Sequence, residues 1–319
     1  MAKKPLDGCK SEWVRVSKSK PCPICERPDW CVRSADGGVV ICMRIASHRE
    51  SKGKQGGWIH KIGHEDSGGL TAYIPPSKPQ KKISYDEWAD LALKHYKYEE
   101  AAKMRASLAR NLGVSEGSLR LLCVGWGYDE WRDLEYSTWP QFTPYRQVTG
   151  IVRRYNSPVT DSGGNKLHMP GGGPGLHFVK YGSNLGEGPL CIVEGGSDVA
   201  ALVTLGVPAI GRPSNLGGVD MLGKMLKKCK REIVVIGERD RKSDRPGTAP
   251  SCPPDCTGCN WCYPGLFGAK TAAEELLELL PGRKISWAMT EDKYKDSRAW
   301  FRSHPKARPE DFINSLERH

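Results

Sequence analysis

The sequence lacks three features that would assign it at once to a familiar class. No run of about eighteen apolar residues occurs, so a membrane-spanning helix and a membrane partner are not expected. The opening residues, Met-Ala-Lys-Lys-Pro, have no apolar core of the kind that a secretory signal peptide carries, which indicates a cytoplasmic protein. No Gly-Lys-Ser or Gly-Lys-Thr occurs, even after the glycine-rich stretch 169–175, so a P-loop motor is excluded from this chain.

Length, charge and cysteine content narrow the remaining classes. The 319 residues suffice for one sizeable core and a smaller module, so two or three units are expected. A formal net charge of +11 and a pI near 9.0 indicate a polyanionic partner. Such charge supplies affinity for the phosphates of a nucleic acid, but it does not recognise the base sequence. Twelve cysteines in an intracellular protein are better explained as metal ligands or buried thiols than as disulfides.

The stretch 190–205 organises the chain, because it predicts a strand, a tight turn and a helix. An apolar run stops at Glu194, two glycines follow, and Asp198 opens a helix rich in Ala, Leu and Val. Glu194 therefore ends a buried strand. In open α/β sheets, ligands bind at the carboxyl ends of the strands, which is where Glu194 is expected to lie.

A second apolar run, 232–237, ends in the same way on Glu238-Arg239-Asp240. Alternate residues of an extended segment share a face, so Glu238 and Asp240 are expected to point together and Arg239 away from them. Acids at two strand ends suit Mg²⁺, which accepts few carboxylates and keeps water and phosphate as its other ligands.

This order of motifs resembles the Toprim domain shared by DnaG-type primases, topoisomerases and some nucleases. Glu194 matches the invariant Glu of that family and Asp198 the Asp that follows it. Glu238 and Asp240 match its Asp-x-Asp pair, although the first member is Glu here. The resemblance implies that these four acids are catalytic, and that Mg²⁺ or Mn²⁺ is held by Glu194, Glu238 and Asp240.

Two further segments extend this resemblance over about residues 186–303. The stretch 268–273 resembles the opening of the family's next helix, and Lys295-Asp296 resembles a Lys-Asp near the end of primase Toprim domains. The loop after the strand 208–210 carries Arg212 and Ser214, which the resemblance places close to the metal and to phosphate.

Four cysteines near the amino terminus have the spacing of a zinc site. Cys22 and Cys25 form a Cys-x-x-Cys half-site, and Cys31 and Cys42 complete a Cys₄ set. The stretch between the last two predicts a β-hairpin that turns at 36–38, which would bring their thiolates together. His48 and Cys9 are the alternative fourth ligands.

A second cluster is dense enough to predict another structural Zn²⁺, with an iron–sulfur cluster as the alternative. Its members are Cys252, Cys256, Cys259 and Cys262.

The stretch 85–112 has the apolar spacing of two amphipathic helices, after which Ser115 is a candidate cap for a third. Short β-like runs follow at 121–124, 138–142 and 148–155. Arg153, Arg154 and Lys166 resemble basic residues in the subdomain that precedes Toprim in DnaG-type primases. That resemblance implies contacts with nucleotide phosphates or template, which Arg binds bidentately and Lys as a point charge.

The expected fold is α/β, with a Toprim core, Rossmann-like and mainly parallel, a small mixed α+β subdomain and an amino-terminal β-rich zinc ribbon. We expect a zinc-binding domain at 1–64, a linker at 65–83, a primase-core-like subdomain at 84–185, a Toprim domain at 186–303 with a cysteine-rich insertion at 241–267, and a charged tail at 304–319.

The resemblance implies a DnaG-like or phage-type DNA primase. Such an enzyme makes short RNA primers on single-stranded DNA from nucleoside triphosphates, and a replicative helicase in trans is a candidate partner. Two alternatives remain: a Toprim metal-dependent nuclease, and an inactive nucleic-acid-binding replication protein of a phage or mobile element. The acids alone do not separate these alternatives.

Overall fold

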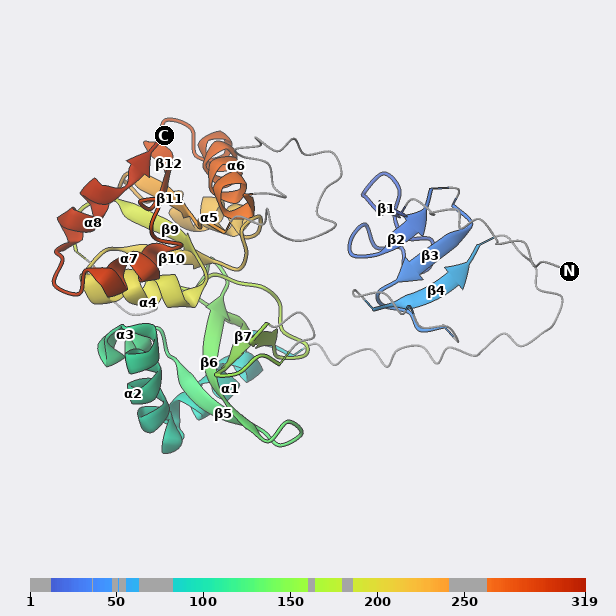
Figure 1. The fold of residues 1–319 in the computed structure, drawn as a ribbon, viewed down its shortest axis with the longest axis horizontal. Coiled ribbons are helices and arrows are strands. Elements are labelled where there is room, and N and C mark those ends of the chain that lie inside the picture. Colours follow the sequence, from blue (N-terminus) through green and yellow to red (C-terminus); the bar gives the residue numbers. More distant parts are fainter. Residues whose placement is uncertain are drawn as a thin grey trace, which may run out of the picture. The chain divides into compact units, whose positions relative to one another are not determined.

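The computed structural model describes residues 13–35, 37–47, 51, 56–62, 83–159, 164–179, 186–240 and 263–319. The chain divides into two compact units, Met1–Gln80 and Lys81–His319 (Figure 1). The predicted second cysteine cluster and the alternative ligands Cys9 and His48 lie outside the described residues. Within the described ranges, every helix is too short or too polar to cross a membrane.

The first unit is an antiparallel sheet whose small core is largely made of cysteine. Its strands follow in the order β1 (Trp13–Arg15), β2 (Val32–Ser34), β3 (Val39–Cys42) and β4 (Trp58–Lys61). β2 and β3 form the predicted hairpin, with Val32 paired to Ile41. Cys22, Cys31 and Cys42 are each 0% exposed and pack with Val40. This unit therefore has few apolar side chains with which to stabilise itself.

The second unit begins with a lobe of three helices and an antiparallel sheet. The helices are α1 (Tyr85–Lys97), α2 (Glu100–Leu112) and α3 (Glu116–Leu121), and the sheet has the order β5 (Gly125–Asp129), β6 (Leu134–Phe142), β7 (Val148–Tyr155) and β8 (Lys166–His168).

Local capping explains where these helices begin and end. Ser84 starts α1 with a capping box, accepting from the N–H of Glu87, and Ser115 caps α3 as predicted, accepting from the N–H of Ser118. The predicted strand at 121–124 is wrong. The N–H of Val124 donates to the carbonyl of Leu119 at the end of α3, so extended structure starts only at Gly125.

The second lobe is built on a five-stranded sheet. Its order is β10 (Ala209–Arg212), β9 (Leu190–Glu194), β11 (Ile233–Gly237), β12 (Ile285–Met289) and β13 (Glu317–Arg318). The first four strands are parallel and β13 runs antiparallel to β12, which confirms the prediction of a mainly parallel sheet. The helices of this lobe are α4 (Gly196–Leu205), α5 (Val219–Leu226), α6 (Pro264–Leu279), α7 (Ser297–Ser303) and α8 (Pro309–Ser315).

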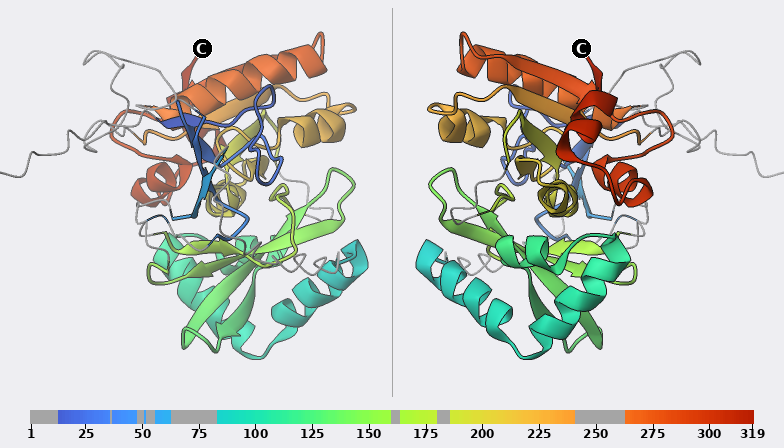
Figure 2. Two further views of the ribbon diagram at one scale, coloured as in Figure 1. Left: turned by 90° about the vertical axis from the view of Figure 1, so that its right-hand side faces the viewer. Right: turned by 90° about the vertical axis from the view of Figure 1, so that its left-hand side faces the viewer.

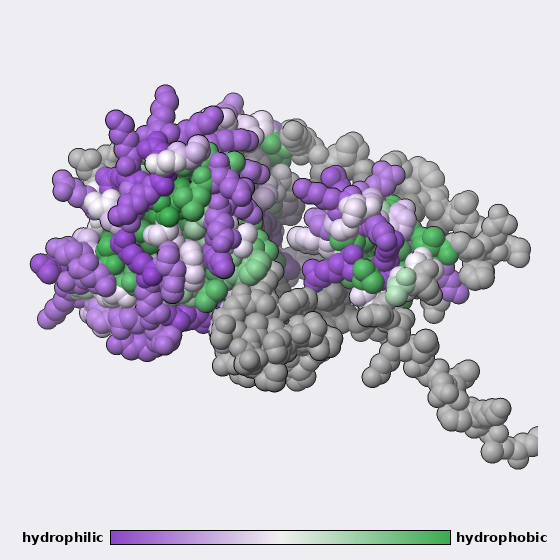
Figure 3. Space-filling model, turned by 90° about the horizontal axis from the view of Figure 1, so that it is seen from above, coloured by the Kyte–Doolittle hydropathy of each residue, from purple (hydrophilic) through white to green (hydrophobic). Residues whose placement is uncertain are grey.

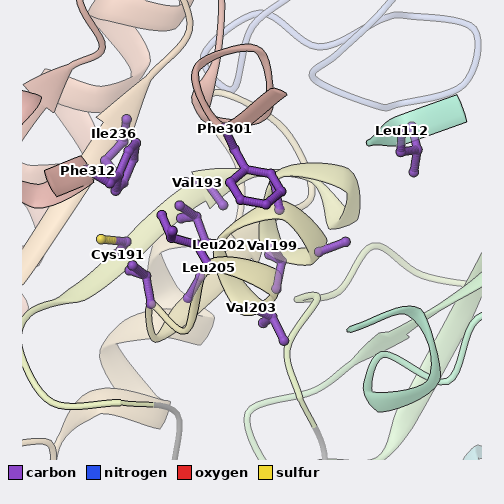
Figure 4. Close-up of a cluster of buried hydrophobic side chains, with 14 of the residues drawn as sticks. Leu112, Cys191, Val193, Val199, Leu202, Val203, Leu205, Ile236, Phe301 and Phe312 are labelled. Carbon is purple, nitrogen blue, oxygen red and sulfur yellow. The ribbon is translucent and has the colours of Figure 1, made fainter. Parts of the chain in front are cut away.

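Strand alternation sends side chains to both faces of the parallel sheet. On one face Val193 packs with Leu202 of α4, Phe301 of α7 and Phe312 of α8 (Figure 4). On the other face Ile192 packs with α5 and α6. Each such side chain, when fully buried, contributes about 1.5–3 kcal/mol. The sheet is thus covered on both sides, as a parallel sheet requires.

The short charged segment at 304–319, for which the sequence predicts at most a helix over 309–316, contains α8 and packs against the second lobe. Phe312 is 0% exposed and Leu316 is 8% exposed, and both belong to the core of the second lobe. β13 then extends the sheet by pairing Glu317 with Met289. The apolar face of α8, rather than its surface charge, decides its place.

The two lobes of the second unit lie against each other (Figure 2), and both backbone and side-chain hydrogen bonds join them. His177 and Gly211 exchange both backbone hydrogen bonds, and the hydroxyl of Thr204 in α4 accepts from the N–H of Ser115. These hydrogen bonds hold the two sheets in a fixed arrangement.

Hydrophilic side chains cover most of the coloured surface drawn in Figure 3, and apolar residues gather in patches between them.

Candidate active site

Glu194 lies where the two sheets of the second unit meet. It is the last residue of β9, and Gly195 turns the chain into α4 with a φ of 79°. A Cβ on Gly196 would lie 2.6 Å from Cε3 of Trp139 in β6. Glycine therefore allows this loop to approach the antiparallel sheet, and it places Glu194 against that sheet.

Three carboxylates converge next to this loop. Asp198 lies in the first turn of α4, Glu238 follows β11, and Asp296 is the N-cap of α7. One oxygen of each lies within 4.8 Å of the others. Asp198 and Asp296 are only 4% and 5% exposed, so the cluster is mostly shielded from water.

Burial and mutual repulsion raise the pKa of two members of this cluster, Asp198 and Glu238. Burial raises the pKa of Asp198 to about 8, with further repulsion from Asp296 and Glu238. Burial likewise raises the pKa of Glu238 to about 7, with repulsion from Glu194, Asp296 and other acids. A bound divalent cation would lower these pKa values again, because it stabilises the ionised carboxylates. The set of donors therefore fits Mg²⁺ or Mn²⁺.

Backbone groups fix the geometry of the cluster. The N–H of Arg298 donates to Oδ1 of Asp198 at 3.1 Å, and the N–H of Ala299 donates to Oδ1 of Asp296 at 2.7 Å. Both donors belong to the first turn of α7, whose amino-terminal end favours negative charge. The carboxylates are thus held in place by the helix that they cap.

The predicted metal ligands Glu194 and Asp240 lie beside this cluster. Burial raises the pKa of Glu194; Arg212 opposes the shift and Asp240 adds to it. Oδ1 of Asp240 accepts the N–H of Gly265 at 2.9 Å and so binds the start of α6. Among the described residues, the acids whose oxygens lie within 4.8 Å of one another are Asp198, Glu238 and Asp296. The predicted set differs, because it combines Glu238 with Glu194 and Asp240. Asp240 instead binds the amino-terminal end of α6.

Arg239 points away from the acids, as strand alternation predicts. Its Nε donates to the carbonyl of Thr290, and its guanidinium pairs with Asp292 at 2.6 Å and with Glu317 at 2.5 Å. On the other side of the segment, Glu238 pairs with Nζ of Lys295 at 3.4 Å. The backbone between the two acids is thereby fixed to the end of the sheet.

Arg154 and Lys166 face the acids from the antiparallel sheet. They are direct neighbours across β7 and β8, so they share one face. Nζ of Lys166 lies 4.0 Å from the point that a Cβ on Gly195 would occupy. Lys166 is exposed, yet the protein around its ammonium, together with Arg154, lowers its pKa. Burial lowers the pKa of Arg154, while Asp198 and Asp296 stabilise its charge.

Arg153 lies on the opposite face of the sheet, contrary to its prediction as a phosphate contact. Its guanidinium pairs with Asp129 at 3.5 Å and lies over the ring of Tyr136, 5.6 Å from the centroid. Successive strand residues face opposite sides, so only one of the two adjacent arginines can reach the acids. That residue is Arg154.

The prediction of a phosphate contact is also wrong for Arg212. Its side chain is 1% exposed and donates to the carbonyls of Asn215 and Gly268, which ties the loop after β10 to α6. A phosphate cannot approach a guanidinium that is covered in this way. Ser214 lies exposed in the same loop, next to Pro213.

A cavity of about 250 Å³ opens between the two sheets beside Glu194. Its walls combine the glycine loop with one face of the antiparallel sheet. The residues that line it are Trp139, Gln141, Val152, Arg154, Lys166, His168, His177, Glu194, Gly195, Gly196, Ser197 and Pro213.

Sequence reasoning missed four residues of this region. Asp296 was noted as part of a Lys-Asp pair, but not as a member of the acid cluster. Arg298 binds both Asp198 and Asp296 and carried no signal of its own. Gln141 and His177 line the cavity, and only their position on strands facing Glu194, which the sequence does not give, distinguishes them from other polar residues.

The cysteine site of the first unit has the dimensions of a zinc site. The Sγ atoms of Cys22, Cys25, Cys31 and Cys42 all lie within 4.8 Å of one another. Cys25 and Cys31 are 3.7 Å apart and Cys31 and Cys42 are 3.9 Å apart. A tetrahedron with Zn–S bonds of about 2.3 Å has edges of about 3.8 Å.

Backbone amides complete this site. The N–H of Met43 donates to Sγ of Cys31 at 3.4 Å, and the N–H of Ile45 donates to Sγ of Cys42 at 3.3 Å. Such bonds stabilise thiolates, which are the form that binds Zn²⁺. Burial raises the pKa of Cys31 to about 12, so a metal ion would be needed to hold this buried thiol as a thiolate beside the other three cysteines.

Solved structures resemble this arrangement of two lobes. A DnaG catalytic core matches with a TM-score of 0.52 at 16% identity, over 73% of this chain and 80% of that chain. The E. coli primase catalytic core matches with a TM-score of 0.53 at 15% identity, over 73% and 80%. The fold is similar to that of DnaG primase catalytic cores. A DnaG primase catalytic domain bound to single-stranded DNA matches this primase-like fold with a TM-score of 0.51 at 16% identity, over 73% and 78%.

The likeness to primase cores rests on structure alone. No protein-family model and no curated protein sequence matches the chain. At these identities the comparison supports the fold alone.

Proposed function

We propose that this chain is a Toprim-type DNA primase, a nucleotidyltransferase that makes short RNA primers on single-stranded DNA. The observation that carries the proposal is the convergence of Asp198, Glu238 and Asp296 within 4.8 Å, within electrostatic reach of Arg154 and Lys166. Acids that can hold a divalent cation, facing basic groups that can hold phosphate, are the parts that nucleotidyl transfer requires.

The basic residues bind the triphosphate in this proposal. Lys166 at the mouth of the cavity offers a point charge, and Arg154 offers two parallel donors to one phosphate. The 3′-hydroxyl of one nucleotide attacks the α-phosphorus of the next, a P–O bond forms, and pyrophosphate leaves. No side chain acts as the nucleophile, so the contribution of the protein is positioning and charge stabilisation.

The acids would hold a divalent cation, which would supply charge neutralisation to the triphosphate and to the attacking oxygen. One oxygen each of Asp198, Glu238 and Asp296 lies within 4.8 Å of the others, and Glu194 and Asp240 lie beside them within electrostatic reach. The longer side chain of Glu238, where the family has Asp, still reaches this group. The first unit, with Zn²⁺ in its Cys₄ site, adds a second contact with the template in this proposal. Contact with a helicase and a metal at Cys252–Cys262 stay predictions.

The test is incorporation of labelled ribonucleotides on single-stranded DNA with Mg²⁺ or Mn²⁺. Glu194→Gln keeps the shape of the side chain and removes its charge, and we expect at least about a hundredfold loss of short products. Glu278→Gln is the matched control, since Glu278 is exposed on α6, and it should retain activity.

Two other outcomes would replace the proposal. Degradation of the template that depends on Glu194 would identify a nuclease. DNA binding without either product, in wild type and variant alike, would identify a binding protein.

A further inference from the structure

The cavity beside Glu194 has two chemically different ends. Lys166 and His168 are exposed and mark its mouth, whereas Gln141 is 1% exposed and His177 is 6% exposed. The mouth is therefore basic and open to solvent. The inner end is polar and closed to solvent.

Gln141 brings an acceptor without a partner to the inner end. Its Nε2 donates to the carbonyl of Gly175 at 3.1 Å. Its Oε1 is buried and has no hydrogen-bond partner among the described atoms. Exchanging O and N would set two acceptors against each other, so the carbonyl of Gly175 fixes the orientation of the amide.

The backbone supports this placement of Gln141. The pairing of β6 with β7 shifts register between Gln141 and Phe142, as at a β-bulge. Bulges re-aim side chains and are common beside active sites. A Cβ on Gly175 would lie 2.9 Å from both N and O of Phe142, so this close approach needs glycine. The bulge and the glycine together hold the amide against the cavity.

His177 makes the inner end neutral. Burial, together with the nearby charge of Lys166, lowers the pKa of His177 to about 4, so the imidazole carries no charge at neutral pH. Its ring lies 3.4 Å from Nε2 of Gln141. Neither Gln141 nor the neutral His177 offers a positive charge to an ionised phosphate, and the amide of Gln141 already donates to the carbonyl of Gly175. The free Oε1 instead requires a ligand that donates a hydrogen bond.

We propose that the inner end of this cavity binds a ribose hydroxyl of the nucleotide, with Oε1 of Gln141 as the acceptor. The inference rests on the proposed function, because the phosphates of the same nucleotide occupy Arg154 and Lys166 at the mouth. Both ends line one cavity of about 250 Å³, close to the lower limit of about 300 Å³ for ligand pockets. The sugar is the part of a nucleotide that carries hydroxyl donors next to the phosphates.

The experiment measures binding of ATP, 2′-deoxyATP and 3′-deoxyATP to the full chain with Mg²⁺, by titration calorimetry. All three share the base and the phosphates, so a difference reports the sugar alone. We expect one deoxy analogue to bind about tenfold more weakly than ATP, because the hydroxyl that it lacks would leave the buried Oε1 of Gln141 without a donor. In Gln141→Met this difference should shrink to less than about twofold. Gln147→Met, at an exposed turn, is the control and should keep the full difference.

Failure of this inference is distinguishable from failure of the proposed function. Equal affinity of the wild type for all three nucleotides would overturn the inference alone, and it needs no variant that folds. A preference that persists in Gln141→Met would overturn it too. No binding of any nucleotide to the wild type would overturn both.

Discussion

Buried His177 should make the stability of the second unit depend on pH in a way that one substitution removes. The pKa of His177 falls from 6.5 to about 4 in the folded chain, chiefly through burial. A group with a lowered folded pKa binds its proton more readily when the chain is unfolded. Stability from the neutral ring is therefore complete above pH 6.5 and is lost as the pH falls towards 4.

The magnitude follows from the shift. One pKa unit corresponds to about 1.4 kcal/mol, so the change from 6.5 to about 4 gives a loss of about 3 kcal/mol. For a unit of this size each kcal/mol moves the Tm by about 2–4 °C. Between pH 6.5 and 4, the wild type should therefore lose about 6–12 °C more than a variant with an uncharged side chain at this position.

His177→Gln is the informative variant, because it keeps a polar side chain that cannot be protonated in this range. Thermal unfolding of the wild type and the variant, followed by tryptophan fluorescence at several pH values, gives the difference between the two curves. Other acids titrate in both proteins, so their contributions cancel. Parallel curves down to pH 4 would refute the assignment of a neutral, buried His177.

Three further predictions concern other parts of the chain. Mg²⁺ should raise the Tm of the wild type but not of Asp198→Asn, because the variant loses one buried ligand; equal shifts by calorimetry would contradict the metal assignment. Gly196→Ala should lower the free energy of unfolding by about 1–3 kcal/mol in urea titrations, since its Cβ would lie 2.6 Å from Trp139, and an unchanged value would show that the loop gives way. Cys31→Ser should remove one equivalent of zinc by mass spectrometry and unfold the first unit, and retained metal would exclude the Cys₄ set.

The sequence predicts local structure best where the spacing of apolar and polar residues along one segment is enough to determine it. The run ending at Glu194, followed by two glycines and a helix, predicts strand, turn and helix, and each is present. The alternation of Glu238, Arg239 and Asp240 likewise predicts that Arg239 points away, which its pairing with Asp292 confirms. Neither prediction requires knowledge of a distant element.

The sequence does not predict the surroundings of a side chain where an element distant in the chain determines them. Arg153 and Arg154 are equivalent in sequence, and only the helices packed on one face of the sheet determine which of them meets the acids. Asp296 joins the acid cluster because α7 begins there, and a lone Asp before a short helix does not reveal this. Arg212 was expected at a phosphate, but carbonyls from a loop and from α6 enclose it.

The meeting of the two sheets at Gly196 has a consequence for dynamics. No side chain separates the glycine loop from Trp139, and the paired backbone of His177 and Gly211 joins the lobes on the same side. Hinge bending between the lobes would break these hydrogen bonds and open packed surface, so the second unit should move as one body. In the proposed function, nucleotide exchange would take place through the mouth at Lys166, and its rate should respond to the size of side chains there rather than to a closing motion.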